Sequence, residues 1–137
     1  MVKPMGETIW LGAKDGKTKI LDSDLTEIKE IDAGGSPYDV VEVDTHFILS
    51  VQEELHFFNK QTWNKDHTMD LERSRRTNCM IKLTNELIVL GCRDGSICIL
   101  KKQEGTNWSI VKSIETGINE EFTNLELIGD TLYCSYK

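Results

Sequence analysis

Four cysteines are the residues of this sequence best suited to metal binding or disulfide formation: Cys79, Cys92, Cys98 and Cys134. Their spacings contain no C-x-x-C pair, and the three histidines fall outside any zinc-ligand pattern. Cys98 and Cys134 each lie within an apolar run, which favours reduced, buried thiols in a cytosolic protein over two disulfides. We therefore predict neither a metal site nor a cofactor.

The sequence also lacks a catalytic constellation. It contains no nucleophile elbow, no phosphate-binding glycine loop followed by Lys-Ser or Lys-Thr, and no metal triad. The adjacent glycines of DAGGSPYD, residues 32–39, precede an expected strand rather than a helix, so no helix N-terminus is available for a phosphate. We predict that the protein is not an enzyme and has no catalytic residue.

One short segment concentrates positive charge in an acidic chain. The chain has 16 basic and 23 acidic side chains and a net charge of −7, yet ERSRR at residues 72–76 contains Arg73, Arg75 and Arg76. Arginine binds carboxylates and phosphates in bidentate fashion, so this segment is a candidate site for an acidic or phosphorylated peptide. A solvated loop is the alternative interpretation. The acidic balance argues against nucleic acid as a partner.

The elements around these residues begin with a repeated hairpin pattern. IVLGCRDGSICIL, residues 88–100, consists of two apolar strands joined by a polar turn. Its Asp-Gly pair favours the reversal because a two-residue turn needs positive φ at both central residues. IWLGAKDGKTKILD, residues 9–22, has the same order. The residues that we expect to form these turns are Gly12, Asp15 and Gly16 in one copy and Gly91, Asp94 and Gly95 in the other.

Two weaker copies complete the series. FILSVQEELHFFN, residues 47–59, has Ser50 in the Gly position, and LYCSYK at residues 132–137 begins a fourth copy. The matched Gly and Ser positions are 38, 41 and 44 residues apart. This period is close to the ~40–45 residues of a four-stranded propeller blade.

Each period has room for two more strands. Short alternating runs precede the hairpins (YDVVEV, CMIKL and FTNLELI), and polar runs follow them (LTEIKEID, TWNKDHTMD and NWSIVKSIE). Leu25, Ile28 and Ile31 have helical spacing, but eight residues between turns are too few for a helix, so we predict a strand. MVKPMG at the start predicts a weak or absent first strand. We expect an all-β chain that forms a single partial propeller domain over residues 1–137. Its repeats are expected near 9–46, 47–86 and 87–131, with a further blade starting at 132–137.

The quoted hairpins, together with LELIGDTLYCSY, resemble blades of divergent WD-repeat-like propellers. The similarity is to those of JNK-interacting (kinesin cargo) scaffold proteins and of a group of Rho guanine nucleotide exchange factors, and more distantly to those of Roco kinases. A WD-repeat blade has Trp-Asp at the end of its third strand, where this chain has Leu21-Asp22, Phe58-Asn59 and Leu100-Lys101. The side-chain network that braces such blades should therefore be largely missing.

A propeller without catalytic residues binds partners through its loops, although the fold does not name them. On the loops between central strands and before inner strands, Lys14 and Arg93 join Arg73, Arg75 and Arg76 as candidate partner-binding residues. The resemblance implies a non-catalytic scaffold or adaptor for protein–protein interaction in signalling. The alternative is a regulatory propeller in a larger signalling enzyme, such as a Rho guanine nucleotide exchange factor or a Roco-type kinase.

Three and a half blades leave strand edges open, and propellers close with ~4–8 blades. We therefore expect this fragment to belong to a propeller of about seven blades, completed by another polypeptide or chain segment, with a closed homo-oligomer as the alternative. No apolar run is long enough for a signal peptide or a membrane span, which predicts a cytoplasmic protein.

Overall fold

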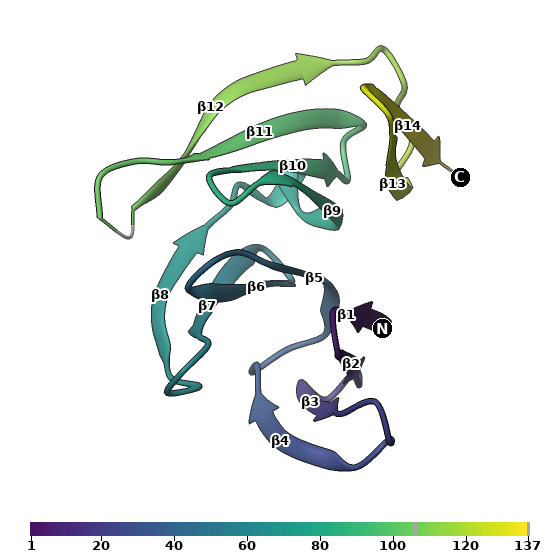
Figure 1. The fold of residues 1–137 in the computed structure, drawn as a ribbon. Coiled ribbons are helices and arrows are strands. Elements are labelled where there is room, and N and C mark those ends of the chain that lie inside the picture. Colours follow the sequence, from purple (N-terminus) through teal and green to yellow (C-terminus); the bar gives the residue numbers. More distant parts are fainter. Residues whose placement is uncertain (106, 137) are drawn as a thin grey trace. The chain divides into compact units, whose positions relative to one another are not determined.

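The computed structural model describes residues 1–105 and 107–136, apart from the Ser74 side chain. Its described residues form β-strands and one short 3₁₀ helix, so the all-β prediction is confirmed (Figure 1). Each sheet consists of consecutive antiparallel strands in sequence order, as in the blades of a propeller. The chain divides into two compact units, Met1–Asp70 and Leu71–Lys137. Lys137, at the end of the expected fourth repeat, lies outside the described residues.

The first unit contains two four-stranded sheets, whose strands Figure 1 labels. Sheet 1 is formed by β1 (Val2–Met5), β2 (Thr8–Gly12), β3 (Lys17–Leu21) and β4 (Glu27–Asp32). Sheet 2 is formed by β5 (Pro37–Glu42), β6 (His46–Val51), β7 (Glu54–Asn59) and β8 (Lys65–Asp70).

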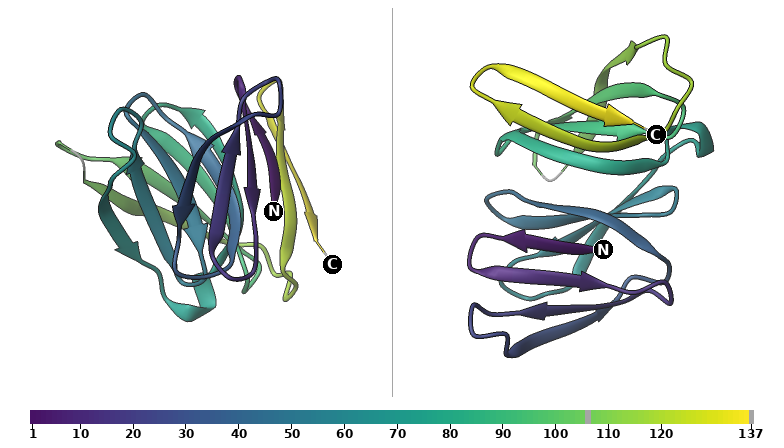
Figure 2. Two further views of the ribbon diagram at one scale, coloured as in Figure 1. Left: turned by 90° about the horizontal axis from the view of Figure 1, so that it is seen from below. Right: turned by 90° about the vertical axis from the view of Figure 1, so that its right-hand side faces the viewer.

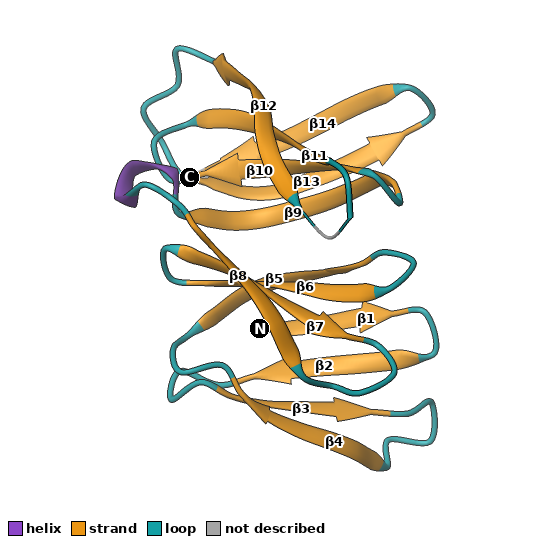
Figure 3. Cartoon of the chain, turned by 90° about the vertical axis from the view of Figure 1, so that its left-hand side faces the viewer, coloured by secondary structure: helices purple, strands orange, loops and turns teal. Residues whose placement is uncertain are grey.

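The second unit contains one complete sheet and one hairpin, preceded by the 3₁₀ helix η1 (Arg73–Arg75), purple in Figure 3. Sheet 3 is formed by β9 (Thr77–Thr84), β10 (Leu87–Cys92), β11 (Ser96–Lys102) and β12 (Trp108–Glu115). The hairpin is formed by β13 (Phe122–Ile128) and β14 (Thr131–Tyr136).

The prediction of a weak or absent first strand is wrong. β1 pairs with β2 from Val2 opposite Leu11 to Met5 opposite Thr8, and the backbone of Met1 exchanges two hydrogen bonds with Gly12. The sequence concealed this strand because Pro4 interrupts it and apolar residues do not alternate along it. β1 is an edge strand, where a proline costs no ladder hydrogen bond on its open side.

Leu25, Ile28 and Ile31 do not form a helix despite their spacing, and the strand prediction is confirmed by β4. Leu25 lies in the turn before β4 with φ +64, and it is 65% exposed. Ile28 is 49% exposed, whereas Ile31 is 8% exposed and faces the core. Only one of the three residues is therefore buried, so their helical spacing does not mark a face that packs on the core.

The Asp-Gly hairpin turns form, but Gly12 and Gly91 lie in β2 and β10 rather than in the turns, and positive φ is not found at both residues of each Asp-Gly pair. Only the glycines have it, Gly16 at +92 and Gly95 at +83. In each turn the glycine N–H donates a hydrogen bond to a backbone carbonyl: Gly16 to that of Ala13, and Gly95 to that of Cys92. Asp15 and Asp94 instead accept a backbone N–H two residues ahead through Oδ1, at 3.0 and 2.9 Å. These hairpins therefore place the glycine alone in the left-handed region, as three-residue loops do.

Each unit has its own apolar core. Between sheets 1 and 2 the core is aromatic: Trp10 lies 4.9 Å from Phe47, and Phe47 stacks on Trp63 at 5.4 Å between ring centroids. In the second unit the hairpin lies against sheet 3, as the right-hand view of Figure 2 shows. That core consists of Cys79, Val89, Ile97, Phe122 and Leu125.

Polar side chains brace sheet 2 at places that the sequence did not indicate. His46 in β6 bonds to Asp66 in β8 through Nε2 at 2.9 Å, and Thr45 Oγ1 lies 2.7 Å from its Nδ1. The Ser50 hydroxyl accepts the Asp39 N–H at 3.0 Å. The missing signal was strand register, because His46 and Asp66 are 20 residues apart.

Candidate partner-binding loops

The basic segment 72–76 is a tight turn of helix rather than an extended loop. Glu72 accepts the N–H of Arg75 at 2.7 Å, and Arg73 accepts that of Arg76 at 3.4 Å, which closes η1. Arg73 is exposed, while Arg75 and Arg76 are half-buried. The three arginines are thus held on a short, folded segment directly before β9.

This segment lies beside the turn between β10 and β11. The Arg76 carbonyl accepts the backbone N–H of Arg93 at 2.8 Å, which ties the two loops together. The sequence placed Arg93 and the arginines of η1 on one loop face, and this bond brings them together within the second unit. Lys14 is exposed in the equivalent turn of sheet 1, in the other unit.

A third loop, residues 116–121, completes the group and adds an acid. Arg93 Nε lies 3.2 Å from Glu121 Oε1, and Asn78 donates to Glu121 Oε2 at 3.4 Å. The Arg93 side chain remains 46% exposed. A surface ion pair of this kind contributes at most about 1 kcal/mol to stability.

Gly95 fixes the third loop over the turn. The Thr116 hydroxyl donates to the Gly95 carbonyl at 2.6 Å, and a Cβ added at Gly95 would lie 1.7 Å from the carbonyl oxygen of Ile118. Sheet 1 repeats this arrangement more loosely, since a Cβ on Gly16 would lie 2.7 Å from the Gly35 nitrogen. Both turn glycines therefore allow the loop after the fourth strand to approach the backbone.

Two thiols lie in the hairpin that carries Arg93. The Cys92 thiol donates to Cys98 Sγ at 3.6 Å, and Ser113 Oγ lies 3.5 Å from the same sulfur. The bond from Cys92 lowers the pKa of Cys98, and Ser113 and the charge of Arg75 act in the same direction. All four cysteines are free thiols. Cys79, Cys92 and Cys98 are buried, whereas Cys134, which was also expected to be buried, is only partly so. Among the residues that the structure describes, no cluster of His, Cys, Asp or Glu could hold a metal ion.

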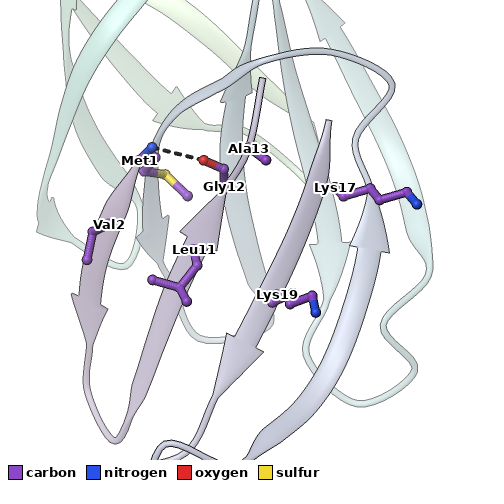
Figure 4. Close-up of a pocket in the computed structure, with 7 residues that line it drawn as sticks. All are labelled: Met1, Val2, Leu11, Gly12, Ala13, Lys17 and Lys19. Carbon is purple, nitrogen blue, oxygen red and sulfur yellow. Dashed lines mark hydrogen bonds between the residues drawn. The ribbon is translucent and has the colours of Figure 1, made fainter. Parts of the chain in front are cut away.

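A shallow pocket of about 350 Å³ lies on sheet 1, in the first unit (Figure 4). Met1, Val2 and Leu11 provide apolar lining, and Lys17 and Lys19 bring two ammonium groups. The sequence did not reveal this pocket because it depends on the pairing of β1 with β2.

No family model matches this chain, and the comparison with curated proteins finds no similar sequence. Solved structures are similar in fold. The WD40 β-propeller domain of Doa1 matches with a TM-score of 0.75 at 18% identity, over 93% of this chain and 43% of that one. The Pan2 WD40 domain of Neurospora crassa matches with a TM-score of 0.75 at 12% identity, over 99% and 43%. A chain of the Mitotic Checkpoint Complex matches with a TM-score of 0.73 at 8% identity, over 99% and 45%.

These likenesses confirm the predicted fold: the sheets are those of part of a WD40-type β-propeller. The chain spans less than half the length of the structures it matches. Within the described residues, no helix is long and apolar enough to cross a membrane.

Proposed function

We propose that this chain is a non-catalytic propeller module that binds other polypeptides through the loops of its second unit. One observation carries the proposal: segments 72–76, 93–95 and 116–121 are joined by the bond from Arg93 to Arg76 and the contacts of Gly95. Loops held on a rigid sheet are where binding residues concentrate. Residues 1–137 then form a single partial propeller domain. Its repeats near 9–46, 47–86 and 87–131 each run from the second strand of one sheet to the first strand of the next.

The ligand that fits these loops is an acidic or phosphorylated peptide. Arg73, Arg75 and Arg93 supply guanidinium groups that bind carboxylates and phosphates in bidentate fashion. Glu121 occupies Arg93 in the free protein and yields its place to the ligand. Lys14, in the corresponding turn of sheet 1, is a candidate for a partner contact of its own. The free thiols support a cytoplasmic location.

The resemblance to JNK-interacting scaffold proteins makes a scaffold or adaptor in signalling the first candidate. The resemblance to Rho guanine nucleotide exchange factors and Roco kinases makes the regulatory propeller of a larger signalling enzyme the second. An exchange or kinase domain in the same polypeptide would decide for the second, and coiled-coil heptads for the first.

The binding test uses an array of phosphoserine peptides, with the unphosphorylated sequences alongside. The variant Arg73→Glu/Arg75→Glu/Arg93→Glu should lose binding to the phosphorylated peptides, and added salt should weaken wild-type binding because exposed charges are screened. Lys17→Glu/Lys29→Glu/Lys65→Glu makes the same change in net charge on exposed residues of the first unit and should bind as wild type. Equal losses in both variants, or no phosphopeptide binding at all, would contradict the proposal.

A further inference from the structure

Two buried thiols, Cys92 and Cys98, form a cluster that the loop function does not use. Cys92 is the last residue of β10 and Cys98 lies in β11, on either side of the turn that carries Arg93. Both cysteines are completely buried, and the Cys92 thiol donates to Cys98 Sγ at 3.6 Å. The two sulfurs would have to approach by about 1.5 Å to form a disulfide bond.

The surrounding groups give the two thiols different roles. Cys98 accepts the Cys92 S–H, and the Ser113 hydroxyl lies 3.5 Å from the same sulfur. The bond from Cys92 lowers the pKa of Cys98, and the same bond raises the pKa of Cys92. The charge of Arg75 also favours the Cys98 thiolate. Because the thiolate is the nucleophilic form of cysteine, Cys98 is the sulfur that attacks, while Cys92 keeps its proton.

Solvent lies only one side chain away from Cys98. Its neighbour Ser113 is exposed and belongs to β12, the outer strand of sheet 3. Residues 111–115 of this strand are all exposed, so few buried contacts hold it in place. The register of β11 against β12 also shifts between Ile99 and Leu100, directly after Cys98, and such a shift disrupts the ladder. A molecule as small as hydrogen peroxide therefore reaches the Cys98 sulfur when β12 opens locally.

The strand register makes a bond between the sulfurs act on the backbone. Cys98 pairs with Leu90, and Cys92 lies two residues further along β10, so the cysteines are diagonal neighbours. The Cα atoms of diagonal neighbours lie about 7–8 Å apart, which exceeds the usual span of a disulfide. Closing the bond therefore moves the backbone. β10 is already irregular at this point, since its register against β9 shifts between Gly91 and Cys92.

We propose that Cys92 and Cys98 form a thiol pair that hydrogen peroxide converts into a reversible disulfide. The Cys98 thiolate attacks one peroxide oxygen, so that an S–O bond forms, the O–O bond breaks, and the departing hydroxide takes up a proton to become water. The Cys92 sulfur then attacks the sulfur of the Cys98 sulfenic acid. The S–S bond forms as the S–O bond breaks, and the hydroxyl group leaves with the Cys92 proton as water. In total the two sulfurs lose two electrons to the peroxide.

The disulfide should change the contacts of Arg93. This residue directly follows Cys92, and its N–H donates to the Arg76 carbonyl at 2.8 Å. Movement of Cys92 toward Cys98 draws this N–H away from the carbonyl, so oxidation loosens the link between η1 and the turn. The disulfide goes beyond the proposed loop function because it forms without a ligand. Only its effect on partner binding rests on that function.

Trypsin makes the disulfide directly visible, because it cleaves between the two cysteines, after Arg93. The reduced full chain is treated with hydrogen peroxide at pH 7, the remaining thiols are blocked, and the digest is analysed by mass spectrometry. Peptides 83–93 and 94–101 should be joined through Cys92 and Cys98, and dithiothreitol should separate them. Hydrogen exchange at the Arg93 amide should be at least about fivefold faster in the oxidised chain, the effect of losing one hydrogen bond.

Single substitutions separate the two roles. In Cys92→Ser the reaction should stop at the Cys98 sulfenic acid, which dimedone traps. Cys98→Ser should give neither a disulfide nor a dimedone product at Cys92. Cys79→Ser alters another buried thiol of sheet 3 and should form the disulfide as wild type does. Ser113→Ala changes an exposed residue, so folding is retained, and it should slow disulfide formation severalfold because Cys98 loses a hydrogen-bond partner.

Three results would overturn the proposal or a part of it. One is a folded wild-type chain in which peroxide leaves Cys92 and Cys98 unlinked. Another is a mixture in which these cysteines pair equally well with Cys79 or Cys134, because the folded geometry would then not direct the reaction. Unchanged exchange at Arg93 in the oxidised chain would overturn the effect on the turn. A disulfide that forms in a chain without phosphopeptide binding would contradict the loop proposal alone.

Discussion

The core between sheets 1 and 2 contains several large rings, whereas the core between sheet 3 and its hairpin has one ring, Phe122, among aliphatic and sulfur-containing side chains. Position by position, Trp10 in β2 corresponds to Val89 in β10, each two residues before the matched glycine. Trp10 is completely buried and meets Phe47, and Val89 is 2% exposed beside Cys79. The same repeat thus supports two cores of different size, and the larger one lies where both sheets are complete.

The largest effect should come from removing the ring at the first of these positions. Trp10→Ala should lower the free energy of unfolding by about 3–5 kcal/mol, because it leaves a cavity between two sheets. Val89→Ala at the matched position should cost about 2 kcal/mol. Urea denaturation followed by circular dichroism measures both changes. Equal losses would mean that the aromatic core adds nothing beyond its position.

The next largest difference in stability should be between variants of the two turn glycines. Gly95→Ala should cost about 3 kcal/mol, since its Cβ would overlap the Ile118 carbonyl in addition to the strain of positive φ. Gly16→Ala should cost about 2 kcal/mol, because the closest atom is farther away. The same denaturation experiment compares them, and a larger loss at Gly16 would contradict the tighter packing in the second unit.

The turn aspartates should show a smaller difference. Asp94→Ala should cost about 1 kcal/mol, because Asp94 Oδ1 accepts both the backbone N–H and the hydroxyl of Ser96. Asp15→Ala removes one exposed bond and should cost less than about 0.5 kcal/mol. Thermal unfolding of the two variants against wild type gives the order, and Asp15→Asn serves as a control that retains an acceptor.

The pH dependence should be the smallest effect, and it should belong to the first unit, which contains all three histidines. Burial lowers the pKa of His56 below 6.5 and outweighs the opposing hydrogen bond to Glu54. The unfolded chain therefore binds the proton at higher pH than the folded chain does. Stability from this group is complete above about pH 6.5 and falls as the pH drops toward the folded pKa.

His56→Gln tests this dependence. Below pH 6.5 the variant should show a flatter dependence of unfolding free energy on pH than wild type does. Near pH 8 the unfolding free energy of both proteins should depend little on pH. An unaltered slope in the acid range would show that His56 does not titrate with folding.

The hairpins could be predicted because each is encoded locally, by two apolar runs and a turn whose glycine must take positive φ. β1 could not be, because Pro4 and Lys3 give no strand signal and its place depends on pairing with β2. The conformation of Asp94 was also missed, because the loop has three residues rather than two, and only its glycine then needs positive φ.

For the loops, the sequence identified the basic residues and not their contacts. Repeat alignment placed Arg93 and the arginines of η1 on one side of the blades, and the bond between Arg76 and Arg93 agrees with this. The ion pair with Glu121 depends on how residues 116–121 fold over the turn, which no local pattern records. The residue types could therefore be read from the sequence, whereas the contacts between distant loops could not.

Every sheet in this chain pairs each strand with its neighbour in the sequence. Such pairing closes only short loops, so little chain entropy is lost before contacts form, and folding is fast for a β protein. During synthesis sheets 1 and 2 can pack together once residues 1–70 have emerged, without waiting for residues still to be made. The strand order therefore lets the first unit fold on the ribosome while the arginine loops are still being translated.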